Sequence, residues 1–286
     1  MKILVCGGSG FIGRALCRNL IAQNHQVFIY THSANVKTIF KTSAFLKKTF
    51  SSTNFRVVNV YNNFPNVDVI INLSGESIAK KKLTKDRLDE ILQSRIDTID
   101  LLLDEYRLRA PKIFIQASAT GIYKDNVSCD ETGELGDSVY AQICKAIEDK
   151  ALSLAQNSTF RYSKICLARI GVVVGRSGGL RQNLRFLPKT HFIPGDNTIP
   201  YILIKDIVSA FNLIINKKLS GPVNLCSDDY VSLNKLISLC KPHCPIAIPC
   251  PRKILTLDKR GELLLADQKI EPKVLLENGF IFSKIK

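Results

Sequence analysis

The sequence predicts an α/β protein with a doubly wound parallel sheet and a smaller C-terminal lobe, and two observations carry that prediction. Short apolar runs alternate with helical patterns from the N-terminus to about residue 170, and such alternation is typical of a parallel sheet. The first run, Lys2–Cys6, leads directly into Gly7, Gly10 and Gly13, where a helical pattern begins at Phe11. A length of 286 residues suits one such domain with a small lobe.

The expected strands are nearly continuous in apolar character, which suits strands buried on both faces. After Lys2–Cys6 they are His25–Thr31, Phe55–Val60, Asp68–Leu73, Lys112–Ala117 and Lys164–Ile170. Apolar residues at helical spacing predict a long helix over 83–107, and a further helix is expected over 138–156. Right-handed crossovers between these strands would place a ligand at their carboxyl ends.

The first turn has the features of a dinucleotide-binding turn. Gly7 permits backbone angles closed to other residues, and Gly10 lets the main chain approach a pyrophosphate without a Cβ in the way. Gly13 lets the helix lie close on the strand, and the N–H groups at the helix start favour a diphosphate. We therefore predict a Rossmann-like domain whose cofactor contacts here are Gly7, Gly10, Phe11, Ile12 and Gly13.

The charge distribution favours one cofactor over another. The chain has 40 Lys and Arg against 25 Asp and Glu, a net charge of +15, and residues 1–67 contain no acidic residue. An NAD-selective fold normally offers a carboxylate near the end of the second strand, to hold the ribose 2′-hydroxyl. Here Thr31 and His32 stand in that place, with Lys37 nearby. Hydroxyls, an imidazole and a lysine can bind a 2′-phosphate that a carboxylate would repel, so we predict NADP(H).

Several classes of partner are not expected. No aromatic-basic motif accompanies the positive charge, so we expect no nucleic acid. No run of about 18 apolar residues exists and the first strand starts at once, so we expect a cytoplasmic protein without a membrane partner. Nine scattered cysteines suit reduced thiols, and the cluster 240–250 lacks a paired CxxC spacing, so no metal is expected. A small-molecule substrate is the expected partner, and a homodimer is the candidate assembly.

Five short motifs together resemble a known family. They are GGSGFIG at 7–13, INLSGE at 71–76, SRIDT at 94–98, SATGIY at 118–123 and RIGVVVG at 169–175. In this order they resemble the extended or atypical short-chain dehydrogenase/reductase superfamily, in particular its epimerase family proteins. Further matches at 221–224, 268–272 and 278–280 extend the resemblance to that group's small C-terminal domain.

The resemblance implies a domain organisation. An NADP(H)-binding domain is expected over 1–228, with 177–200 on the substrate side, and a small C-terminal domain over 229–286. Arg176, Arg181 and Arg185 stand near the expected mouth of the pocket. They either clamp an anionic group of a substrate or solvate a loop.

The resemblance also implies cofactor contacts further along the chain. Thr31 and His32 would hold the adenosine phosphate, although the family usually has arginine at the second position. The other implied contacts are Asn72, Leu73 and Ser74 after the fourth strand, Glu90 and Arg95 on the long helix, and Val173 beside the nicotinamide. From the residues alone, Glu90 and Arg95 would be a surface ion pair and Asn72 a turn former.

The catalytic residues are less clearly marked. Short-chain reductases use a Ser with a Tyr and a Lys four residues apart on one helix, and Ser118 stands in the expected place. Tyr140, however, is followed four residues later by Cys144, and Lys145 is turned about 140° from Tyr140 on an ideal helix. Three interpretations stay open. In the first, Tyr123 is the acid that works with Ser118, although it could equally be a packed aromatic residue. In the second, Lys145 enters the pocket on a distorted helix, although it could equally lie on a solvated face. In the third, the chain binds cofactor without the usual chemistry.

Two hypotheses for the function follow. The leading one is an NADP-dependent oxidoreductase or epimerase, similar to nucleoside-diphosphate-sugar epimerases, that acts on a small polar substrate with Ser118, Tyr123 and Lys145 as candidate catalytic residues. The competing one is a non-catalytic NADP(H)-binding or redox-sensing protein, favoured by the missing Tyr-Lys spacing. Fold alone does not decide between them.

Overall fold

A seven-stranded parallel sheet forms the centre of the computed structural model, which describes residues 1–30, 55–58, 64–78, 81–176, 178–244, 246–257, 261 and 264–283. The strand order is β12-β7-β5-β4-β1-β2-β3. The strands are β1 (Lys2–Cys6), β2 (Gln26–Tyr30), β3 (Phe55–Val58), β4 (Val69–Asn72), β5 (Ile113–Ala119), β7 (Lys164–Ile170) and β12 (Gly221–Leu225). The predicted fold class is confirmed, and each of the six expected strands is present within one or two residues of its expected ends.

The sheet winds in two directions from β1. From β1 the chain builds outward through β2 and β3 on one side, then returns to place β4, β5, β7 and β12 on the other. Cys6, the last residue of β1, is in register with Tyr30 at the end of β2 and with Asn72 at the end of β4. A reversal of strand order of this kind opens a crevice at the carboxyl ends of the strands. The glycine turn after β1 therefore lies at the switch point.

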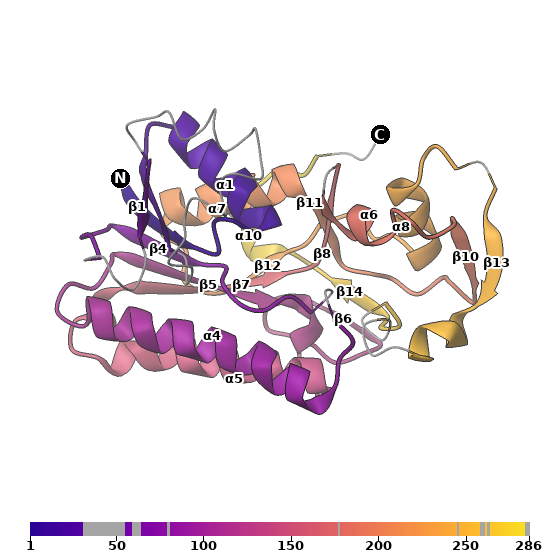
Figure 1. The fold of residues 1–286 in the computed structure, drawn as a ribbon, viewed down its shortest axis with the longest axis horizontal. Helices are drawn as coiled ribbons and strands as arrows, with labels where there is room; N and C mark the ends of the chain where they lie inside the picture. The colour runs from indigo at the N-terminus through magenta and orange to yellow at the C-terminus, as the bar shows by residue number, and fades with distance from the viewer. Residues whose placement is uncertain are drawn as a thin grey trace.

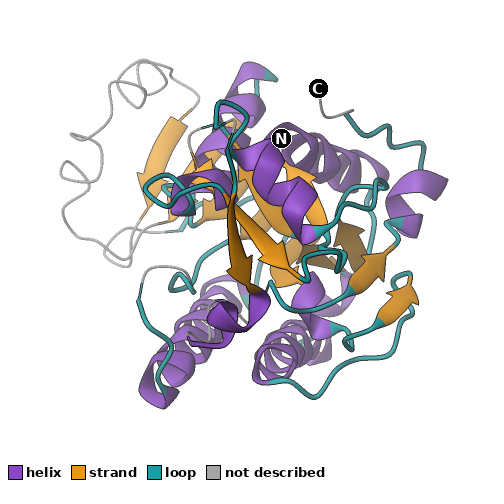
Figure 2. Ribbon diagram, turned by 90° about the vertical axis from the view of Figure 1, so that its right-hand side faces the viewer, coloured by secondary structure: helices purple, strands orange, loops and turns teal. Residues whose placement is uncertain are grey.

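Helices cover both faces of the sheet (Figure 1). The helices α1 (Phe11–Ala22), α7 (Ile204–Lys217) and α10 (Lys273–Glu277) lie on one face, and α4 (Lys85–Tyr106) and α5 (Val139–Ser153) on the other. Figure 2 shows these two layers of helices with the strands between them. Within β1, Ile3 and Val5 join one core and Leu4 and Cys6 the other. Burial on both faces explains why the strand is apolar at every one of these positions.

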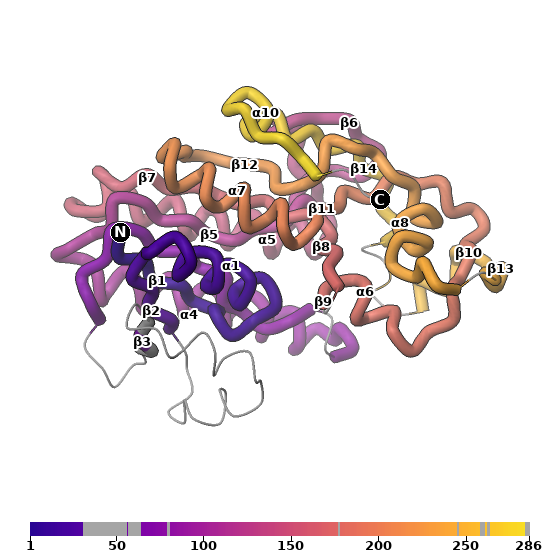
Figure 3. Tube along the Cα trace, turned by 90° about the horizontal axis from the view of Figure 1, so that it is seen from above, coloured from indigo at the N-terminus to yellow at the C-terminus, as the bar shows by residue number. Residues whose placement is uncertain are grey.

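A smaller lobe extends from the carboxyl side of the sheet (Figure 3). Its elements are β8 (Val172–Gly175), β9 (Gly178–Gly179), α6 (Leu180–Asn183), β10 (Thr190–Ile193), β11 (Tyr201–Leu203), α8 (Leu233–Cys240), β13 (Ile248–Pro251) and the 3₁₀ helix η4 (Arg252–Leu257). Buried residues between 174 and 201 pack with buried residues between 231 and 240 to form its core. Two separate stretches of chain thus build one lobe.

The last described segment returns to the main body. β14 (Gln268–Ile270) pairs with β6 (Val127–Cys129), and α10 lies against β12. Leu275 and Phe280 join the core between the sheet and α1. Three short 3₁₀ helices complete the fold: η1 (Thr120–Ile122), η2 (Leu154–Gln156) and η3 (Phe160–Tyr162). The boundary at residue 228 stays a prediction, and α10, which lies beyond it, packs against β12 of the main sheet.

Candidate functional site

The turn between β1 and α1 packs closely on its surroundings because glycines stand in it and in the first turn of α1. Gly7 has φ +75°, and a Cβ there would lie 2.6 Å from the carbonyl oxygen of Leu73. A Cβ on Gly13 would lie 2.3 Å from the carbonyl oxygen of Gly7. Gly10 donates its N–H to that same Gly7 oxygen over 2.9 Å. Any side chain at position 7 or 13 would therefore push the turn, the strand end and the helix apart.

The start of α1 is suited to an anion. Gly10 is the N-cap residue, no side chain caps this end, and no acidic residue stands in the first turn. The first N–H groups of a helix lack intrahelical partners and carry partial positive charge. The Ile12 side chain packs against the core between the sheet and α1. The group of Ile12 that a ligand could contact is therefore its main-chain N–H. Together with the missing Cβ atoms, this makes a cradle that fits the diphosphate of a dinucleotide.

Phe11 links this turn to the small lobe. A Cβ on Gly178 would lie 2.2 Å from Cδ2 of Phe11, and one on Gly175 would lie 2.5 Å from its Cζ. Gly179, with φ +66°, borders the same ring. The Phe11 ring is thus packed against the β8–β9 hairpin, and the predicted cofactor contact of Phe11 stays a prediction.

The chain after β4 is held by the Asn72 side chain. Asn72 is fully buried, donates from Nδ2 to Gln116 Oε1 over 2.9 Å and accepts at Oδ1 from the Ser74 N–H over 3.2 Å. The Leu73 N–H donates to the Cys6 carbonyl over 3.0 Å. The amide of Asn72 therefore orders the turn, as the residues alone suggested. Cofactor contacts of Asn72, Leu73 and Ser74 through the main chain stay predictions.

Glu90 and Arg95 do not pair with each other. Glu90 is half exposed, and its Oε2 lies 2.5 Å from Nη1 of the buried Arg87, which also contacts Glu76 Oε2 at 2.7 Å. Arg95 instead donates from Nη1 to the carbonyl oxygens of Glu76 and Ile91, over 3.1 and 2.8 Å. Burial lowers the pKa of the Arg95 guanidinium. Arg95 thus reaches the loop after β4, whereas Glu90 belongs to an ion pair with Arg87 that the sequence pattern did not reveal.

Ser118 lies toward the carboxyl end of β5, two strands from the glycine turn. Its Oγ is buried and makes no hydrogen bond of acceptable geometry within the described part of the chain. Burial raises the pKa of the neighbouring Cys144 thiol to about 11, the Glu148 charge adds to this, and the Ser118 hydroxyl acts in the opposite direction. A buried hydroxyl without a partner is uncommon in folded proteins. It is consistent with a group reserved for a ligand.

Tyr123 is bound into a buried network. Its hydroxyl donates to Asn224 Oδ1 over 2.7 Å and accepts from Arg169 Nη1 over 2.8 Å. Burial raises the pKa of Tyr123 to about 12. Arg169 also makes a bidentate pair with Glu148, over 2.9 and 2.8 Å. This geometry favours the packed aromatic residue among the alternatives for Tyr123, and its catalytic role stays a prediction.

Lys145 lies on the exposed part of α5, whereas Cys144 and Glu148 on the same helix are buried. Its exposure favours the solvated face among the two alternatives, and a catalytic Lys145 also stays a prediction. Tyr140 is half buried and packs against the cluster of Leu83, Leu88 and Ile91. The structure therefore brings Cys144, rather than Lys145, to Ser118.

The remaining candidates have separate environments. Val173 is half buried on β8 and packs against the core between the sheet and α1. Arg181 donates to the carbonyl oxygens of Cys240 and Leu239, over 3.0 and 3.2 Å, and so caps the end of α8. Arg176 and Arg185 are exposed. Thr31 and His32, the predicted phosphate contacts, lie outside the described residues.

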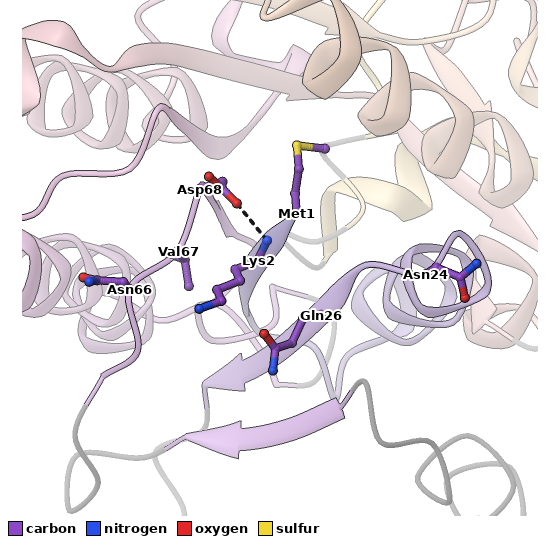
Figure 4. Close-up of a pocket in the computed structure, with 7 residues that line it drawn as sticks. All are labelled: Met1, Lys2, Asn24, Gln26, Asn66, Val67 and Asp68. Atoms are coloured by element: carbon purple, nitrogen blue, oxygen red, sulfur yellow. Dashed lines mark hydrogen bonds between the residues drawn. The ribbon is translucent and has the colours of Figure 1, made fainter.

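A hollow of about 650 Å³ lies at the opposite ends of the strands from the glycine turn (Figure 4). Its lining includes Met1, Lys2 and Gln26, the last two being the first residues of β1 and β2. Asp68 closes one side by accepting the Lys2 N–H over 2.9 Å. This hollow is therefore at the amino ends of the strands, away from the glycine turn. No group of three metal-binding side chains is found among the described residues, and no described helix is long and apolar enough to span a bilayer.

The fold and the glycine turn define the class of this chain, a Rossmann-like α/β protein. The model of the NAD dependent epimerase/dehydratase family matches residues 3–226, so the chain belongs to that family. Epimerase family protein YfhF of Bacillus subtilis is 27% identical over 297 residues, covering 99% of this chain and 94% of the relative. An epimerase family protein of Staphylococcus aureus is 25% identical over 303 residues, covering 98% and 94%.

Solved structures show the same fold. The human epimerase family protein with NADPH is 21% identical, with a TM-score of 0.82 over 100% of this chain and 96% of its own. UDP-glucuronic acid 4-epimerase from Bacillus cereus, in complex with UDP-glucuronic acid and NAD, is 19% identical, with a TM-score of 0.76 over 99% and 95%. The family match over residues 3–226 confirms the predicted resemblance to epimerase family proteins.

Proposed function

We propose that this chain is an NADP(H)-binding oxidoreductase or epimerase that acts on a small polar substrate, with nucleoside-diphosphate sugars as the first class to test. The observation that supports the proposal is that two features lie together at the carboxyl ends of the strands. The glycine turn forms an anion cradle at the switch point, and the unpartnered Ser118 Oγ lies two strands away. The family relatives support the substrate class, since one neighbour was solved with UDP-glucuronic acid.

Several described groups would hold the cofactor. The cradle at Gly7, Gly10 and Gly13 suits the diphosphate, and the loop after β4, with Arg95 beside it, suits the adjoining ribose. The predicted preference for NADP(H) rests on Thr31, His32 and the absence of acidic residues from 1–67. It is supported by the NADPH bound in the human relative.

Ser118 is the residue to which we assign a direct role. A bound nicotinamide cofactor supplies or accepts hydride. The Ser118 hydroxyl would donate a hydrogen bond to the oxygen on the substrate carbon that changes oxidation state, and its described neighbour is the Cys144 thiol, a weak partner. The Cys144 thiol, with its pKa near 11, stays protonated at neutral pH and does not act as the base.

One alternative has its own support. The Tyr123 hydroxyl is bonded to both Asn224 and Arg169, and Lys145 is exposed, so neither is poised as a proton carrier. These positions favour the second hypothesis, a protein that binds NADP(H) without turnover.

Turnover measurements separate the two functions. The protein is incubated with NADPH or NADP⁺ and a panel of UDP-sugars and small ketones, while reduced nicotinamide and epimeric products are followed. We expect turnover that falls by about a hundredfold in Ser118→Ala, because one hydrogen-bond donor to the reacting oxygen is lost. Cofactor affinity should not change, and Ser128→Ala, an exposed serine on β6, serves as the control. A cofactor-saturated protein without turnover on the whole panel would favour the non-catalytic alternative.

A further inference from the structure

Gly75, in the loop after β4, has no space for a side chain. A Cβ at this position would lie 2.6 Å from Cζ of Arg95 and 2.7 Å from both its Cγ and Nη1. The arginine side chain therefore lies along the face of Gly75 where any other residue would carry its side chain. Gly75 also has φ +139°, a backbone conformation that favours glycine.

Arg95 cannot easily move away from this seat. Its Nη1 donates to the carbonyl oxygens of Glu76 and Ile91, and these two bonds fix one arm of the guanidinium. The guanidinium is planar, so fixing one arm also sets the direction of its remaining donors. A methyl group on Gly75 would displace Cγ together with Cζ, and this displacement would break the two bonds.

The seat lies next to the diphosphate cradle. The carbonyl oxygen of Leu73, two residues before Gly75, is the atom that a Cβ on Gly7 would strike at 2.6 Å. The loop that Arg95 contacts from α4 is therefore in direct contact with the glycine turn. A cation held against that loop would stand beside the anionic part of a dinucleotide bound there.

We propose that Gly75 is a positioning residue, whose missing side chain seats the Arg95 guanidinium so that it can bind the diphosphate-ribose part of the cofactor. This inference rests on the proposed function. The proposal gives a role to a glycine outside the turn after β1. Cofactor affinity would then depend on the contact between the loop after β4 and helix α4.

A double-mutant cycle tests the inference. NADPH affinity is measured by calorimetry for the wild type, Gly75→Ala, Arg95→Ala and the double variant. Loss of a charge-assisted hydrogen bond to phosphate weakens binding by about tenfold or more. We expect such a loss in each single variant, and we expect the double variant to bind no more weakly than Arg95→Ala.

Thermal unfolding of the same four proteins gives a second reading. Gly221→Ala is the matched control, because Gly221 has φ +78° but no atom lies within 4 Å of the position of its Cβ. It reports the cost of a positive φ where a side chain meets no other atom. We expect Gly75→Ala to lower the unfolding temperature more than Gly221→Ala does, and we expect this excess to become smaller when Arg95 is also replaced by Ala, the remainder being the backbone strain of φ +139°.

Two results would overturn the inference. One is unchanged NADPH affinity in Gly75→Ala, and the other is additivity of the two substitutions in both measurements. If the wild type itself bound no NADPH, the proposed function would fail and the positioning role would fail with it. In that case, non-additive unfolding temperatures of Gly75→Ala and Arg95→Ala would still show that the two residues are in contact, in a purely structural role.

Discussion

Cys144 shows how one residue alters the chemistry of the site. It stands four residues after Tyr140, where the superfamily resemblance implies a lysine, and it is buried beside Ser118. A lysine there would supply a cation that lowers the pKa of a neighbouring tyrosine. The thiol supplies none, and burial keeps it protonated. The usual assignment of proton transfer therefore cannot be carried over to this chain.

The burial of Cys144 predicts that it is inert. All nine cysteines are free, and six of them are buried, among them Cys144. Because only thiolates react readily and burial raises the thiol pKa to about 11, Cys144 should resist alkylation in the native state near pH 8. The half-buried Cys129, Cys244 and Cys250 are the internal control and should be labelled first, as peptide mass spectrometry would show. Labelling of Cys144 as fast as these three would mean that the thiol is accessible.

Prediction from sequence succeeded for single residues whose conformation is local. The glycines at 7, 10 and 13 mark a turn because their missing Cβ atoms are themselves the reason for it. The network of Tyr123 could not be predicted in the same way, since its partners Arg169 and Asn224 are 46 and 101 residues away in sequence. Nor does the spacing of Glu90 and Arg95 reveal that Arg87 takes up Glu90.

Among the elements, α5 and β7 are joined by a buried ion pair. Arg169 on β7 meets Glu148 on α5 through two hydrogen bonds, and the side chains of both are 6% exposed. Burial acts to lower the pKa of Arg169, but its contacts with Glu148 and Tyr123 raise that pKa above its ordinary value. The pair thus fixes the helix that carries Cys144 against the strand that is in register with Ser118.

Removing one partner of this pair should be costly. We expect Glu148→Ala to lower the free energy of unfolding by about 3–5 kcal/mol, because it leaves the buried Arg169 charge without its carboxylate. Asp149→Ala, the next residue on α5 and exposed, should change stability by less than about 0.5 kcal/mol. Urea unfolding followed by circular dichroism measures both. Equal effects of the two substitutions would contradict the account of the pair.

The elements were largely predictable, with one instructive exception. Strands buried on both faces are recognised by their continuous apolar runs, so β1 to β7 within the sheet were expected close to their observed ends. β12 was not expected as a strand, because it begins with Gly221 and Pro222, which are rare inside strands. It lies at the edge of the sheet, where proline is tolerated.

The whole molecule joins a main body to a lobe across the candidate site. Phe11, at the start of α1, packs under the β8–β9 hairpin from which the chain continues into the lobe. The elements that form the glycine turn and those that begin the lobe are therefore in contact. The composition of the lobe could not predict this arrangement, because its core is assembled from two distant stretches of chain.

Charge is also a property of the whole molecule, and it supports the cofactor preference. The net charge is +15, and residues 1–67, which contain the glycine turn and the expected phosphate contacts, carry no acidic side chain. A dinucleotide with an additional phosphate gains from such an environment, although salt screens the part of the gain that comes from exposed charges.

The most direct test of the central claim is a calorimetric titration of the protein with NADPH and NADH, side by side at physiological salt. The account predicts saturable binding of NADPH and clearly weaker binding of NADH, because the second strand is followed by Thr31 and His32 and no carboxylate. Preference for NADH would contradict the assignment of NADP(H). Binding of neither dinucleotide would contradict the cofactor site itself and reduce the glycines at 7, 10 and 13 to a structural turn.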